Sequence, residues 1–223
     1  MVAQCQEVAV RAGWKLTTLL KARSFFNQRD LVRLYKCHVL PVLEFCTPVV
    51  WHAADSVVGV LDNVQRRFLR ELSLTEEEAL LVYNLAPLAC RRDMAALGVI
   101  HRTVLGKGPQ HFKHWFFASE RTGGYDTRYR RSLHSKQLYD YLQAGAYTEV
   151  FRRSLFGRVR VYNRLQQRVV DANSMRLFQK MLQENLKQSA TTHQLETGNT
   201  YSGNRLRPWQ TTYSAATNWR LLS

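Results

Sequence analysis

Carboxylates are the first side chains to consider for chemistry, because enzymes that make or break phosphodiester bonds hold two divalent metals between clustered acidic residues. This sequence has no Asp-Asp pair, and its aspartates are scattered singly. Its one acidic run, Glu76-Glu77-Glu78, comes directly after Thr75, and a Thr followed three residues later by Glu is typical of a helix start. We therefore expect no catalytic residues and no bound metal in this chain.

Histidines and cysteines give no stronger indication of a site. His111 and His114 are three residues apart and could share a helical face, but no Cys, Asp or Glu stands at a spacing that completes a zinc site. The cysteines lie far apart, without Cys-x-x-Cys spacing, at Cys5, Cys37, Cys46 and Cys90. Each is on or near an apolar helical face, which predicts buried free thiols in a reducing compartment. No cofactor is expected.

Arginine is the residue type whose distribution is unusual. The net charge is +15, and it is concentrated: residues 121–180 hold 13 basic and 4 acidic residues, against 15 and 11 in residues 1–120. A basic segment of this kind favours a polyanionic partner, most simply nucleic acid. A basic surface without a specific partner remains the alternative. An anionic membrane is less favoured, because no long basic amphipathic helix stands out.

Three of these arginines are positioned by a helix that follows a polar turn at residues 51–56. Apolar residues recur there at three- and four-residue steps: Val57, Val60, Leu61, Val64, Phe68 and Leu72. Arg66, Arg67 and Arg70 fall on the opposite side, and Asp62 precedes Arg66 by four residues, a favourable order for an ion pair. We expect this helix to bury one face and present three guanidiniums on the other.

A helix from Asp30 is expected before that turn. Asp30 is a good N-cap, and Leu31, Leu34 and Tyr35 begin the apolar pattern. Pro41 removes a backbone hydrogen bond, which predicts a kink or break.

The order of motifs in this region resembles a known family. The runs YKCHVLPVLEF, then Trp51, then LDNVQRRFLR are similar to the segment that follows the polymerase palm in non-LTR retrotransposon reverse transcriptases. The later stretch from Ser154 to Leu182 is similar to the C-terminal Trp-Asn-x-Leu-Pro…Phe motif of the same elements, with Tyr162 in place of Trp and Gln166 in place of Pro. The resemblance extends from Val8 to Leu186.

The resemblance implies a thumb-like helical element that grips template RNA and the RNA–DNA duplex behind the active site of an RNA-directed DNA polymerase. The match begins downstream of the palm, and the sequence lacks the Asp-Asp of that site. We therefore expect no polymerase activity from the isolated chain, unless a palm in another chain supplies the carboxylates.

Further helices are expected at residues 3–22, from Thr75 to near Asn84, and from Pro87 to Leu105, where Gly106 ends the pattern. Arg91 and Arg92 stand near the start of the last of these, which opposes the helix dipole. Acidic neighbours such as the Thr75 helix, or a phosphate, would account for them. The resembling family has a recurrent Arg-Arg at this position, which implies a structural or RNA-contacting role.

The most basic region follows an aromatic-rich stretch at residues 111–117. A loop or arm comes next, in which Arg128, Arg130 and Arg131 alternate with tyrosines. Guanidiniums interleaved with aromatic rings fit single-stranded nucleic acid, but a basic loop whose tyrosines pack into the core fits equally. A helical region over about residues 147–170 would carry Arg158 and Arg160.

A last helix, capped by Asn173 or Ser174, would bury four apolar side chains: Met175, Phe178, Met181 and Leu182. The residues after Lys187 are rich in Thr, Ser, Gln, Asn and Gly and predict a disordered tail.

The expected architecture is mainly α: a helical bundle with a basic loop and a disordered C-terminal tail. We divide it into a thumb-like region at 1–117, a basic helical region at 118–187 and a tail at 188–223. No signal peptide is visible, and no apolar run approaches the roughly 18 residues of a membrane span, so a soluble nuclear or cytoplasmic protein is expected.

The expected function is binding of RNA or an RNA–DNA duplex, without catalysis. The alternative is a domesticated or remnant helical protein that acts as a structural or interaction module. The expected contacts to nucleic acid are ten arginines: Arg66, Arg67, Arg70, Arg91, Arg92, Arg128, Arg130, Arg131, Arg158 and Arg160. Oligomeric state does not follow from the sequence.

Overall fold

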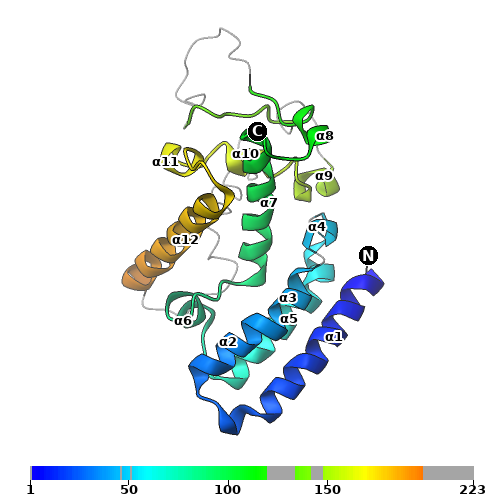
Figure 1. Ribbon diagram of the computed structural model, residues 1–223, viewed down its shortest axis with the longest axis vertical. Coiled ribbons are helices and arrows are strands. Elements are labelled where there is room, and N and C mark those ends of the chain that lie inside the picture. Colours follow the sequence, from blue (N-terminus) through cyan, green and yellow to red (C-terminus); the bar gives the residue numbers. More distant parts are fainter. Residues whose placement is uncertain (1, 46, 51, 120–133, 142–147, 198–223) are drawn as a thin grey trace, which may run out of the picture. The chain divides into compact units, whose positions relative to one another are not determined.

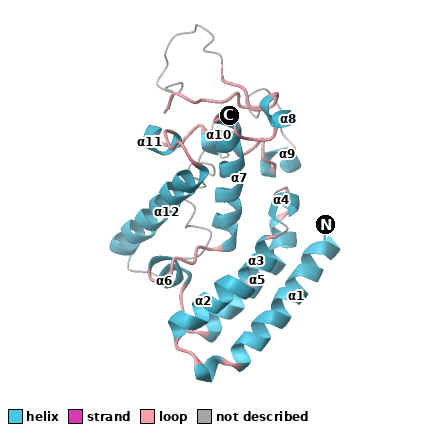
Figure 2. Ribbon diagram, viewed as in Figure 1, coloured by secondary structure: helices cyan, strands magenta, loops and turns pink. Residues whose placement is uncertain are grey.

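The computed structural model describes residues 2–45, 47–50, 52–119, 134–141 and 148–197. Over these residues the chain is mainly α-helical, as the sequence predicts (Figures 1 and 2). Their one β-type pairing is an isolated antiparallel bridge between Ala118 and Leu138.

The described chain forms two compact units. Unit 1 comprises residues 2–92 with 189–197, and unit 2 comprises residues 93–188. The divisions lie between residues 92 and 93 and between residues 188 and 189, inside two helices, and the sequence predicts divisions after residues 117 and 187.

Unit 1 is a set of helices followed by the first turn of a long one. Its elements are α1 (Val2–Lys21), the 3-10 helix η1 (Arg23–Phe25), α2 (Gln28–His38), α3 (Leu40–Glu44), α4 (Thr47–Val50), α5 (Asp55–Glu71), α6 (Glu76–Leu81) and the start of α7 (Leu88–Val104). The longest helix contact is that of α1 along α5, and α1 also packs on α2 and α3 (Figure 1).

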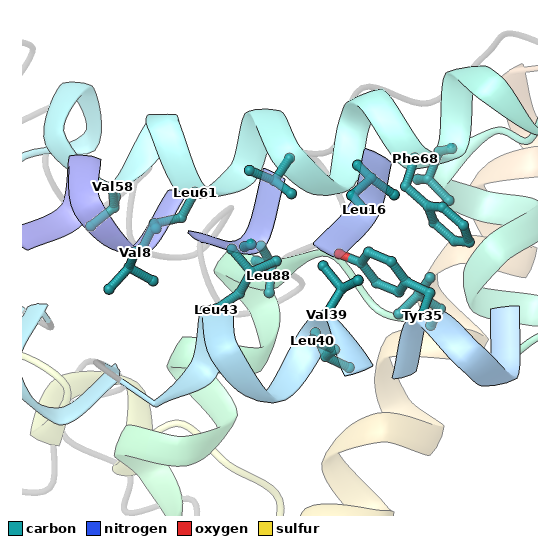
Figure 3. Packing of buried hydrophobic residues seen from close by; sticks show 14 of the residues in the cluster. Val8, Leu16, Tyr35, Val39, Leu40, Leu43, Val58, Leu61, Phe68 and Leu88 are labelled. Carbon is teal, nitrogen blue, oxygen red and sulfur yellow. The ribbon is translucent and has the colours of Figure 1, made fainter. Parts of the chain in front are cut away.

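The core of unit 1 is formed by the facing sides of α1, α2, α3 and α5. On α1 the spacing of Cys5, Val8, Ala12 and Leu16 places all four on one buried face. Figure 3 shows Val8 close to Leu61.

The centre of this core is aromatic. The ring of Tyr35 stacks on that of Phe68, with centroids 4.1 Å apart and planes 7° from parallel (Figure 3). Fully burying an aromatic side chain is worth about 1.5–3 kcal/mol, so this stacked pair contributes to the stability of unit 1.

The buried face of α5 is rotated from the expected one. Val58, Gln65 and Leu69 are buried, whereas Val57 and Leu72 are only partly buried. Leu61, Val64 and Phe68 lie inside both the expected and the observed face, so the helix still directs its arginines outward.

Local start and stop signals largely behave as predicted. Thr75 Oγ1 accepts from the Glu78 N–H at 3.1 Å and the Glu78 carboxylate accepts from the Thr75 N–H at 2.9 Å, which confirms the capping box. The break at Pro41 is also observed, since α2 ends at His38 and α3 begins at Leu40 with Pro41 in its first turn.

The N-cap predicted for α2 is wrong by three residues. The side chain of Asn27 accepts from the Asp30 N–H at 2.9 Å, so Asn27 is the cap and Asp30 lies in the first turn. Asn caps as well as Asp does, and a carboxylate in the first turn also suits the helix dipole.

Unit 2 contains the rest of α7, then α8 (Gln110–Lys113), α9 (Glu149–Arg153), α10 (Val159–Tyr162), α11 (Gln167–Val170) and most of α12 (Met175–Thr197). The end of α7 is confirmed: Gly106 has a φ of 74°, a left-handed conformation that glycine adopts without strain. Its N–H bonds the Thr103 carbonyl at 2.9 Å.

The helical region predicted over about residues 147–170 consists of three short helices, α9, α10 and α11. Ser154 is extended and its hydroxyl donates to the Phe151 carbonyl, which ends α9. Gly157 then lies so close to the carbonyl of Arg152 that a Cβ would stand 1.9 Å from the oxygen. Gln166 is extended again before α11.

The last helix is longer than predicted. Ser174 Oγ accepts from the Leu177 N–H at 3.2 Å, which confirms a cap at this position. Phe178 and Leu182 are fully buried, while Met175 and Met181 are half-buried. Since α12 continues to Thr197, the prediction of a disordered tail is wrong for residues 188–197, and its remainder, 198–223, lies outside the described residues.

The cysteine prediction is correct only in part. Cys5 and Cys90 are buried and are not disulfide-bonded, but Cys37 is exposed on α2. Cys46 lies outside the described residues.

Within the described helices, none combines the length and the apolar character needed to cross a membrane.

Candidate nucleic-acid interface

The outer face of α5 presents three of the ten predicted arginines. Arg66, Arg67 and Arg70 are all exposed, on the side of the helix opposite the buried Leu61 and Phe68. Arg66 and Arg70 are four residues apart, so they occupy the same stripe of the helix. The amphipathic pattern thus holds guanidiniums on a rigid element, with a packed core directly behind them.

These three guanidiniums form no ion pair with the described carboxylates of unit 1. The prediction of an ion pair between Asp62 and Arg66 is wrong, because Asp62 binds Arg92 instead. Arg66 acts on Glu76 only through its charge: burial raises the pKa of the Glu76 carboxyl, and Arg66 opposes that rise.

Arg91 and Arg92 are held in ion pairs within unit 1. The guanidinium of Arg92 donates to both carboxylate oxygens of Asp62, at 2.8 and 2.9 Å. Arg91 is likewise bidentate on Glu44, with its Nη2 3.1 Å from Oε2. Acidic neighbours do explain this Arg-Arg pair, but they come from α3 and α5 rather than from the Thr75 helix. Bidentate pairs of this geometry fix the start of α7 against both helices.

Arg158 and Arg160 also form ion pairs, within unit 2. Arg158 Nη2 lies 2.9 Å from the carboxylate of Asp93, and Arg160 Nε donates to Asp140 at 2.9 Å. Both acids are buried, with side chains 4% and 6% exposed. A guanidinium that neutralises a buried carboxylate is costly to remove and is not available as a free cation. Arg128, Arg130 and Arg131 lie outside the described residues.

The sequence does not identify the acidic partners of the paired arginines: Glu44, Asp93 and Asp140 do not stand out, and Asp62 pairs with Arg92 instead of the predicted Arg66. Each of these four carboxylates lies 20 to 65 residues from its arginine. Their immediate sequence neighbours differ, since Asp93 directly follows Arg92 whereas Glu44 lies between Leu43 and Phe45, so the local sequence does not identify the partner.

Unit 2 also contains a group of aromatic rings. Residues 112–117 contribute Phe112, Trp115, Phe116 and Phe117, and these meet Tyr139, Tyr141, Phe151 and Phe156. Phe116 is buried, whereas Trp115 is 52% and Phe117 45% exposed. The group is therefore partly core and partly surface.

Two histidines are buried around Tyr162 in unit 2. His101 Nε2 donates to the Ala172 carbonyl at 2.8 Å, which leaves its Nδ1 to accept from the Tyr162 hydroxyl at 3.1 Å. His134 Nε2 donates to the Tyr162 carbonyl at 3.0 Å, and its Nδ1 accepts from the Lys136 N–H at 3.1 Å. Burial lowers the pKa of both imidazoles and raises that of the Tyr162 hydroxyl. The hydrogen bonds all go to protein groups, so this cluster is structural.

The predicted metal-site candidates remain separate exposed side chains. His111 and His114 are both exposed, and the residues that the structure describes contain no group of three or more potential ligands.

Comparison of the chain with protein-family models, with curated proteins and with solved structures gives no match.

Proposed function

We propose that this chain binds nucleic acid through the arginine face of α5, as a thumb-like and C-terminal part of a reverse transcriptase of the non-LTR retrotransposon type. The observation that carries the proposal is that Arg66, Arg67 and Arg70 are exposed and form no ion pair with any carboxylate in the described part of the chain. The same three arginines lie in the LDNVQRRFLR run on which the family resemblance rests.

The chemistry of such a face is contact with phosphates. Guanidiniums bind phosphate oxygens bidentately and independently of base sequence, so they position a duplex or strand without reading it. RNA or an RNA–DNA duplex is the partner that the resemblance favours. Because binding would release counterions, affinity should fall steeply as salt rises.

Charge reversal at two positions tests the proposal. In the Arg66→Glu, Arg70→Glu variant, the log–log salt slope of RNA affinity should become shallower by roughly 1.4 to 1.8, since each lost phosphate contact removes about 0.7 to 0.9. Affinity at low salt should fall at the same time. Fluorescence anisotropy across a salt series measures both quantities, and circular dichroism checks that the helices are retained.

A matched control is available on α1 of the same unit. Lys15 and Lys21 are exposed, and Lys21, like Arg70, lies in the last turn of its helix. The Lys15→Glu, Lys21→Glu variant changes the net charge equally and should leave the slope nearly unchanged. Equal losses in the two variants would place the contact elsewhere and contradict the proposal.

A helical interaction module without nucleic-acid binding is the second candidate. The observation that favours it is the internal pairing of Arg91, Arg92, Arg158 and Arg160, because these four are held by carboxylates. Under this candidate the unmodified chain shows no salt-dependent affinity for RNA, and reversal at Arg66 and Arg70 changes nothing.

A further inference from the structure

The bridge between Ala118 and Leu138 places two aromatic side chains directly opposite each other. The Tyr139 N–H bonds the Phe117 carbonyl at 3.1 Å and the Ser119 N–H bonds the Gln137 carbonyl at 2.9 Å, so the two segments run antiparallel. Side chains alternate between the two sides of such a pair. Leu138 points inward and is 4% exposed, while Phe117 and Tyr139 share the outer side.

On that outer side the two rings stack. Their centroids are 5.1 Å apart and their planes 21° from parallel, and they are 45% and 37% exposed. Tyr141 supports both from one edge, at 5.1 Å from Tyr139 and 6.2 Å from Phe117. The Tyr141 hydroxyl donates to the Trp115 carbonyl at 2.9 Å, which ties Trp115 to the same group. The exposed rings are thus held in place before any partner binds.

The charge of the surrounding sequence identifies the kind of partner. Residues 121–180 carry a net charge of +9, and the stretch 120–133, which joins the two paired segments, contains four arginines and one aspartate besides Glu120. A polyanion that also offers flat aromatic faces satisfies both features. Single-stranded nucleic acid does so, whereas a duplex keeps its base faces stacked inside.

We propose that Phe117 and Tyr139, supported by Tyr141, form a platform on which unpaired bases stack. This inference deepens the proposed function, because it assigns a single-stranded segment of RNA or DNA to unit 2 while α5 of unit 1 holds phosphates. The platform recognises bases by their faces and reads little sequence.

The test is the Phe117→Ala, Tyr139→Ala variant, with fluorescence anisotropy on a uridine 20-mer, a thymidine 20-mer and a duplex of the same length. Loss of a stacked base should weaken single-strand binding by at least about tenfold, with the salt slope unchanged because no charge is removed. Duplex binding should not change. The RNA and DNA strands show whether the 2′-hydroxyl matters in addition.

Three further variants keep the result interpretable. Phe117→Tyr with Tyr139→Phe retains both rings and should bind normally, whereas Phe117→Leu retains apolar packing but removes a ring and should lose affinity. Trp14→Ala removes a 75% exposed aromatic from α1 and should have no effect. Far-UV circular dichroism checks that each variant is folded.

The outcomes separate this inference from the proposed function. If the alanine pair weakens single-strand and duplex binding equally, or neither, the platform is overturned. If it abolishes single-strand binding while reversal at Arg66 and Arg70 does not alter affinity or salt slope, the platform stands and the α5 proposal fails. If the unmodified chain binds no oligonucleotide, or binds acidic protein or phosphatidylserine vesicles through the same rings instead, the platform is wrong.

Discussion

At the scale of single residues, the stability of unit 1 depends on Asp62, because its carboxylate compensates the charge of the mostly buried Arg92 guanidinium. Both side chains are mostly buried, at 25% and 12% exposure, and they form two hydrogen bonds. Removing one partner of such a pair leaves the other with an uncompensated charge away from water, which costs more than the pair itself contributes.

We therefore expect Asp62→Ala to lower the free energy of unfolding by about 2 kcal/mol, between the values for exposed and fully buried pairs. Glu7→Ala is the matched control, because its pair with Arg11 is 61% and 62% exposed. That variant should lose less than about 0.5 kcal/mol. Urea unfolding measures both, and equal losses would show that the partial burial of the Asp62 pair has no energetic consequence.

At the scale of elements, the break between α9 and α10 depends on a close approach of the backbone. The chain passes Arg152 so tightly that a Cβ on residue 157 would overlap its carbonyl group, and the obstructing atoms are backbone rather than a mobile side-chain end. Neither segment can move away without disturbing a helix end.

Gly157→Ala should accordingly destabilise unit 2 by about 2 kcal/mol or more, as forced overpacking of backbone does. Gly13→Ala should do the opposite. Gly13 lies within α1 with nothing within 4 Å of an added Cβ, so the alanine should add up to about 1 kcal/mol through helix propensity. Thermal unfolding distinguishes the two signs, and a stable Gly157→Ala protein would mean that the turn has room to relax.

Elements set by neighbouring residues could be predicted from the sequence. The capping box at Thr75, the break at Pro41, the stop at Gly106 and the cap at Ser174 each act over three or four residues, so the pattern contains the whole interaction. The division of the helical region at residues 147–170 into three short helices could not be predicted in this way. The turns between these helices depend on how the chain buries Val159, Tyr162 and Val169. Gly157 is the one residue in the local sequence that indicates a turn.

The candidate interface was only partly predictable for a related reason. The outward direction of Arg66, Arg67 and Arg70 follows from helical periodicity alone. Whether an arginine is free or paired depends on residues far away in the chain, as Arg91 and Glu44 illustrate. The stacking of Phe117 on Tyr139 likewise requires the pairing of two segments that are separated by the basic stretch.

At the scale of the whole molecule, the response to acid should differ between the two units. The buried histidines His101 and His134 both belong to unit 2, and burial is the first cause that lowers the pKa of each. Lys136 lowers both further, while hydrogen bonds to carbonyl groups, and Asp171 in the case of His134, oppose the shift. His134 has a second reason to stay neutral, because its Nδ1 accepts the Lys136 N–H and protonation would replace that acceptor with a donor.

The sign of the effect follows from proton linkage. Above the unfolded histidine pKa of about 6.5 both states are neutral, so folding carries no protonation penalty. As the pH falls below that value, the unfolded chain takes up protons that the native state excludes, and stability decreases by at most about 1.4 kcal/mol per pH unit for each histidine. Unit 2 should therefore lose stability between neutral and mildly acidic pH.

Hydrogen exchange read by mass spectrometry, corrected for the intrinsic pH dependence of exchange, measures this loss separately in each unit. Protection of α7 residues after Asp93 and of α12 up to Gln188 should decrease on acidification more than protection of α1 and α5.

His111→Gln with His114→Gln, which alters two exposed histidines of the same unit, should leave the difference intact. His134→Gln should reduce the difference, because glutamine does not titrate, while its amide can donate to the Tyr162 carbonyl and accept from the Lys136 N–H as the neutral imidazole does. An acid response that is equal in the two units, or that survives replacement of both buried histidines, would show that the buried imidazoles do not control it.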